Sequence, residues 1–98
     1  MAHTIVKERY LLDRYSLTES VNSILNGLIA FAIRERVIEL DKQIPDSQRI
    51  AELKELQEEV WQLYNDNASF ETLERMEELV EHYSPILLAS KKKAQTKI

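Results

Sequence analysis

The sequence predicts an all-α protein, a three-helix bundle with an extra short N-terminal helix or arm. The chain of 98 residues has one glycine and two prolines, so it is poor in the residues that tight turns need. Apolar residues recur at spacings of three and four along three segments, which is the period of an amphipathic helix. Short polar or proline-containing stretches separate these segments. We therefore expect long helices joined by short loops, packed in a single domain over residues 1–90.

The beginning of the chain is ambiguous. Residues 4–14 fit either a short helix or an extended arm, because their apolar side chains suit both. Ser16 and Glu19 then form a capping box, in which the hydroxyl and the carboxylate satisfy backbone amides at a helix start. This signal predicts a central helix over about residues 17–41.

The central helix carries the longest apolar stripe of the chain. Its members are Leu17, Val21, Ile24, Leu25, Leu28, Phe31 and Ala32, widened by Ile29, Ile33, Val37, Ile38 and Leu40. The most apolar run is 24–33, and we expect this part of the helix to be buried on most sides. The apolar run 24–33 is too short to span a bilayer, which needs about 20 residues. Gly27 lies within this run and indicates close approach of a neighbouring helix, with a hinge as the alternative.

A loop with Pro45 follows, and Asp46 or Ser47 is expected to cap a second helix that runs to about Tyr64. Its apolar stripe is Ile50, Leu53, Leu56, Val60, Leu63 and Tyr64. Three short polar residues, 65–67, end this helix because their side chains compete for backbone hydrogen bonds.

Ser69 is the expected cap of a third helix over about residues 70–83, in which Phe70, Leu73, Met76, Leu79, Val80 and Tyr83 keep the helical period. The Ser84-Pro85 pair predicts a break or kink, with one further turn at 86–88. The lysine-containing tail, residues 91–98, is expected to be disordered.

Charge is segregated along the chain. Residues 1–34 carry a net charge of +1, residues 35–81 carry five basic and fourteen acidic side chains, and the four lysines of the tail complete the total of −4. Acidic helices argue against nucleic-acid binding by the domain. Without cysteine, and without the order of charges and apolar residues of a secretory leader, the chain is expected to be cytoplasmic and not membrane-bound.

No catalytic, cofactor-binding or metal-binding pattern stands out. His82 has Glu78 one turn earlier, a pair that can bind a metal ion, but a helical site usually needs a second such pair. The glutamates around residues 71–81 resemble a solvated face, with docking of a basic partner as the alternative. The sequence therefore predicts a protein that is not an enzyme and acts through contact with a partner, with self-association also open.

Cations and aromatic residues are mixed near the N-terminus, and both kinds are enriched among interface anchors. The predicted partner-binding residues are Val6, Lys7, Arg9, Tyr10, Arg14, Tyr15 and, on the second helix, Trp61. The alternative is that the N-terminal segment simply covers the bundle core.

Length, helix order and acidity resemble the epsilon-type antitoxins and related small chaperones. The resemblance extends from Leu17 to Leu88, through the segments 17–21, 45–48 and 69–73. It implies an antitoxin or chaperone that masks and inhibits a zeta-like kinase toxin or effector by direct complex formation. It also implies an N-terminal blocking element, which we place at residues 6–15. The alternative is a secretion-type chaperone, or a self-associating helical adaptor, that pairs through the second and third helices.

Overall fold

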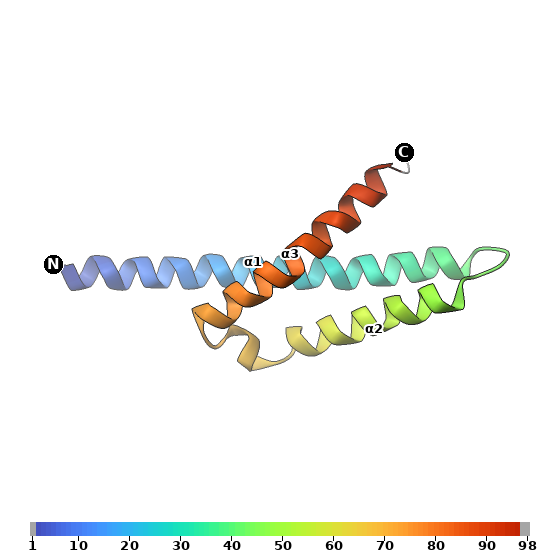
Figure 1. Cartoon of the computed structure of the whole chain (residues 1–98). Coiled ribbons are helices and arrows are strands. Elements are labelled where there is room, and N and C mark those ends of the chain that lie inside the picture. Colours follow the sequence, from blue (N-terminus) through green and yellow to red (C-terminus); the bar gives the residue numbers. More distant parts are fainter. Residues whose placement is uncertain (1, 97–98) are drawn as a thin grey trace.

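The computed structural model describes residues 2–96, with side chains described from residue 10 to residue 91. This part of the chain is an all-α three-helix bundle, as the sequence predicts. Its elements are α1 (Ala2–Leu40), α2 (Ser47–Tyr64), the 3-10 helix η1 (Asn67–Phe70) and α3 (Leu73–Thr96). α2 runs back along α1, α3 crosses α1 at an angle, and the N-terminal part of α1 extends beyond both (Figure 1).

The core lies where α2 and α3 pack on the middle of α1. Its buried side chains come from α1 (Val21, Leu25, Leu28), α2 (Val60) and α3 (Met76, Leu79, Tyr83). The predicted apolar stripes of the second and third helices supply this core and the half-buried residues around it. The molecule is nonetheless long, with extents of 66 × 29 × 15 Å and a radius of gyration of 17.1 Å. A compact domain of this length has a radius of gyration of about 13 Å.

α1 is one continuous helix, so the predicted separate N-terminal helix or arm is wrong. The capping box at Ser16 and Glu19 lies within α1, far from either end. The Thr18 hydroxyl donates to the carbonyl of Arg14 at 2.7 Å, which is a bond between successive turns of one helix. No glycine or proline interrupts residues 2–26, and extending an existing helix costs less than starting a new one.

α2 begins as predicted. The Asp46 side chain accepts hydrogen bonds from the amides of Gln48 and Arg49 at 3.0 and 3.2 Å, which satisfies two free donors of the first turn. The preceding loop is tied to α1 by Glu39, whose carboxylate accepts from the Asp46 amide at 2.9 Å and from Lys42 Nζ at 2.8 Å. These bonds lower the pKa of Glu39.

The start of the third helix differs from the prediction. η1 occupies residues 67–70, so Ser69 is buried in a 3-10 turn and caps nothing. Asp66 caps η1 by accepting from the Ala68 amide at 3.0 Å. Thr72 caps α3 instead, since its hydroxyl accepts from the Arg75 amide at 3.1 Å. Residues 65–72 include five side chains that can cap a helix, and the structure uses Asp66 for η1 and Thr72 for α3.

Pro85 does not end the third helix, which continues to Thr96. A proline lacks an amide hydrogen, so the helix loses one backbone hydrogen bond at Pro85. Pro85 is exposed, so water can reach the carbonyl one turn earlier that this bond would have satisfied. The backbone of residues 91–96 is therefore helical where the sequence predicted disorder. Residues 97–98 lie outside the described residues.

Gly27 lies where α3 crosses α1, and the close approach predicted for it is confirmed. A Cβ atom built at this position would lie 3.1 and 3.3 Å from the two methyl carbons of Leu87. The crossing places α2 and α3 on only part of the circumference of α1. As a result Ile33, Val37, Ile38 and Leu40, which the sequence placed in the apolar stripe of the central helix, are exposed.

Candidate partner-binding surface

The described residues include no group of three or more histidine, cysteine or carboxylate side chains that could hold a metal ion. His82 is exposed and packs edge-on against the Tyr83 ring, with 4.6 Å between ring centroids. Burial, followed by the charge of the nearby Glu59, raises the pKa of Tyr83. That phenol belongs to the core, so its shift reflects packing. No helix in the described range is both long and apolar enough to cross a membrane.

Two predicted partner-binding residues of the N-terminal segment are exposed on α1. The Tyr10 side chain is 48% exposed and that of Tyr15 is 66% exposed, although both are aromatic. Leu11 and Leu12, which the sequence analysis did not select, are exposed beside them. The side chains of the predicted residues Val6, Lys7 and Arg9 lie outside the described residues. This end of α1 extends beyond α2 and α3, which both lie further along it (Figure 1).

Arg14 contacts the chain itself. Its guanidinium donates to the carbonyls of Phe70 and Glu71 at 3.0 and 3.2 Å, and thereby fastens α1 to the end of η1. Those carbonyls lie at the end of a short helix and lack the full set of intrahelical partners. The sequence placed Arg14 among the partner-binding residues, and its role in a complex stays a prediction.

Trp61 is exposed on α2 at 55% of its surface. Its ring stacks on that of Tyr64, with centroids 6.3 Å apart and planes inclined by 25°. Beside it, Ile29 and Ile33 of α1 line a shallow depression of about 230 Å³ together with Trp61. An indole fixed by stacking and adjoining an apolar hollow has the properties of an interface anchor.

The two apolar patches lie along the same line of α1. Eighteen residues separate Leu11 from Ile29 and Tyr15 from Ile33, which is about five complete turns and about 27 Å. We call these four residues together with Trp61 the lateral stripe. Between its two halves the stripe is interrupted by amide side chains at positions 22 and 26.

The sequence pointed to two members of the lateral stripe, Tyr15 and Trp61, as partner-binding residues. It placed Ile29 and Ile33 in the apolar stripe of the central helix, and of these Ile29 does pack against the core whereas Ile33 is exposed. Leu11 was placed in neither set. One signal for the missed residues was present. The apolar stripe of the central helix is wider than two neighbouring helices can cover.

Comparison of the chain with protein-family models, with curated proteins and with solved structures gives no match. The resemblance to epsilon-type antitoxins therefore stays a prediction. The assignment of a role rests on the surface of the molecule.

Proposed function

We propose that this chain is a non-enzymatic binding protein that forms a direct complex with another protein through the lateral stripe. The observation that carries the proposal is the alignment of four exposed apolar side chains and the partly buried Ile29 along one side of the molecule. Large apolar residues that are exposed together mark interaction sites more often than isolated ones do. The two patches are about 27 Å apart, so a partner that covers both needs an extended contact surface.

The resemblance to epsilon-type antitoxins indicates which class of partner to test first. An epsilon-type antitoxin or related chaperone masks a zeta-like kinase toxin or effector, and such a protein needs no catalytic group of its own. On this proposal the exposed end of α1 covers a functional surface of the kinase. The patch around Trp61 supplies a second anchor, and the carboxylates of α2 and α3 raise the association rate with a basic partner.

Co-expression with the neighbouring reading frame tests the proposal. A tagged chain should copurify with its neighbour, and expression of the neighbour alone should arrest growth. Trp61→Ala and Tyr15→Ala should each weaken the complex by about thirtyfold, which corresponds to a hot-spot loss of about 2 kcal/mol. Leu88→Ala is the matched control, because Leu88 is equally exposed, at 57%, but lies on α3.

The outcomes distinguish binding of the partner from inhibition of the partner, and they test whether the lateral stripe is the contact surface. Copurification with a harmless neighbour would retain a binding protein and remove the inhibitory role. Unchanged affinity in both stripe variants, with the partner bound, would exclude the lateral stripe as the contact surface.

A further inference from the structure

The part of the lateral stripe that lies on α1 is symmetric about its middle. Leu11, Tyr15, Ile29 and Ile33 follow one another at intervals of 4, 14 and 4 residues, and Asn22 lies at their midpoint. Asn22 is half-buried and lies on the same side of α1, because the seven residues between it and either neighbour make nearly two complete turns. Since α1 is one continuous helix, the row has the same spacing when the helix is reversed.

The two halves of the row differ in shape. The half that carries Leu11 and Tyr15 protrudes, because this end of α1 extends beyond α2 and α3 (Figure 1). The half that carries Ile29 and Ile33 lies beside α2, and there Trp61 closes the depression of about 230 Å³ on its α2 side. One half is thus a protruding apolar helix end and the other an apolar hollow, and the two shapes fit each other.

We propose that a second copy of the chain covers the lateral stripe when no other partner is bound, in a twofold-symmetric dimer whose α1 helices pack antiparallel. In such a dimer, if one residue of a pair contacts the other across the interface, the reverse contact also forms. An axis through Asn22 sets Leu11 opposite Ile33 of the second copy and Tyr15 opposite Ile29, because each pair is equidistant from residue 22. The protruding end of each copy then fills the hollow of the other.

Asn22 fixes the register of this pairing. On the axis its amide lies next to the same amide of the second copy, and the two can hydrogen-bond to each other. A buried amide that loses its partner is destabilising, so a single asparagine between two helices selects one register. A parallel pairing would also bring the two Asn22 amides together, but it would set hollow against hollow and leave both unfilled.

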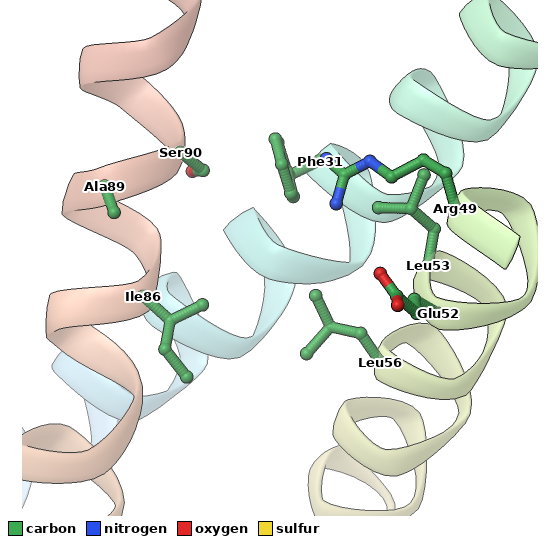
Figure 2. A pocket seen from close by; sticks show the side chains of 8 residues that line it. All are labelled: Phe31, Arg49, Glu52, Leu53, Leu56, Ile86, Ala89 and Ser90. Carbon is green, nitrogen blue, oxygen red and sulfur yellow. The ribbon is translucent and has the colours of Figure 1, made fainter. Parts of the chain in front are cut away.

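A second depression, of about 340 Å³, lies between α2 and the second half of α3 and stays outside this interface. Its apolar lining includes Leu53 and Leu56 of α2 and Ile86 of α3, whereas Trp61 lies on another side of α2. Figure 2 shows Ile86 and Leu56 reaching into this space from the two helices. Ile86 is 36% exposed and Ile33 is 44% exposed, so Ile86 offers a matched control position away from the dimer contact.

The dimer uses the same surface as the proposed complex with another protein, and its role as a competitor rests on that proposed function. A partner reaches the stripe only after the two copies separate, so the dimer keeps these apolar side chains out of water until the partner binds. The dimer itself is tested on the purified chain alone. Its failure would leave the complex with another protein in place, and failure of that complex would leave the dimer in place.

Cross-linking of single-cysteine variants measures the orientation of the helices, since the natural chain has no cysteine. A mixture of Leu11→Cys and Ile33→Cys, treated with a short bis-maleimide, should give a covalent dimer of the two variants, because the axes of packed helices lie about 8–10 Å apart. Leu11→Cys alone should give none, because in the antiparallel dimer the two copies of residue 11 lie about 33 Å apart. Leu88→Cys, exposed on α3, controls for random collision and should not cross-link to either variant.

Sedimentation equilibrium of the full chain measures the strength of the dimer. The natural chain should be a dimer, and Ile33→Glu should weaken it by at least about a hundredfold, because a loss of about tenfold occurs at each of two equivalent contacts. Ile86→Glu introduces the same charge outside the interface and should leave the dimer unchanged, and circular dichroism checks that both variants remain helical. A natural chain that stays monomeric would overturn the proposal. So would a mixture of cysteine variants that gives no covalent dimer, Leu11→Cys that cross-links to itself as readily as to Ile33→Cys, or equal weakening by the two glutamate variants.

Discussion

Gly27→Ala tests how α3 is held across α1. Glycine in the interior of a helix costs about 0.5–1 kcal/mol relative to alanine, and Gly27 lies in the middle of α1. The new methyl group would meet only the methyl carbons of Leu87, at 3.1 and 3.3 Å. Those carbons must therefore move by a few tenths of an ångström. Whether the variant is more or less stable depends on the gain in helix propensity relative to the cost of moving Leu87.

The surroundings of Leu87 favour stabilisation. This side chain is half-buried and borders two shallow depressions on either side of the crossing, so its methyl groups have space to move. A small rotation away from its rotamer costs about 0.5 kcal/mol or more. The expected net gain in the free energy of unfolding is therefore between zero and about 0.5 kcal/mol, or up to about 2–4 °C in melting temperature for a domain of this size. Gly27→Val adds two branched methyl groups and should destabilise by about 1–3 kcal/mol.

Urea denaturation followed by circular dichroism, at one fixed protein concentration, measures both variants. A double-mutant cycle with Leu87→Ala isolates the contact, since alanine at 27 should show its full helix-propensity gain once Leu87 is shortened. The reasoning fails if Gly27→Ala destabilises by more than about 1 kcal/mol in the natural background. It also fails if the cycle shows no coupling between the two positions.

Substitutions at three further positions test other parts of the fold. Arg14→Ala should lower the free energy of unfolding by about 1–3 kcal/mol, because two carbonyls at the end of η1 lose a charged donor, while Arg14→Lys should recover part of the loss in the same urea titration. Hydrogen bonds lower the pKa of Glu39, so its contribution to stability is present above its ordinary value of 4.5 and disappears as the pH falls through the lowered value. Natural protein and Glu39→Gln should accordingly converge in stability on acidification, and a constant difference would contradict this. Burial raises the pKa of Tyr83, so the natural protein should lose stability as the pH rises above about 10 and Tyr83→Phe should not, as followed by alkaline unfolding.

The helical class, the bounds of α2 and the residues of the central core cluster were accessible from the sequence. The reason is that they depend on local signals. A helix-capping aspartate at 46, an apolar period of 3.6 and a scarcity of glycine each act within a few residues. The same local reasoning failed where two signals competed. Ser16 and Glu19 fit the sequence pattern of a helix start, but both lie inside one continuous helix, because extending a helix costs less than starting a new one.

The candidate surfaces depended on tertiary packing. The spacing of Ile33 predicted a core residue, and the sequence gave no sign that Arg14 bonds to a distant part of the chain. The first is exposed because α2 and α3 cover only part of α1, and the second is bound to carbonyls more than fifty residues away in the chain. The periodicity of apolar residues predicts which face of a helix is apolar, but it does not predict how much of that face the neighbouring helices cover.

The sequence by itself determined that this chain forms amphipathic helices and segregates its charge. Only the tertiary structure decided which apolar residues remain uncovered. α3 crosses α1 at an angle (Figure 1), with Leu87 close to Gly27, and a depression lined by Phe31, Leu53 and Ile86 stays open between α2 and the second half of α3. The physical reason is that helix formation depends on neighbours in the chain, whereas burial depends on the relative placement of whole helices.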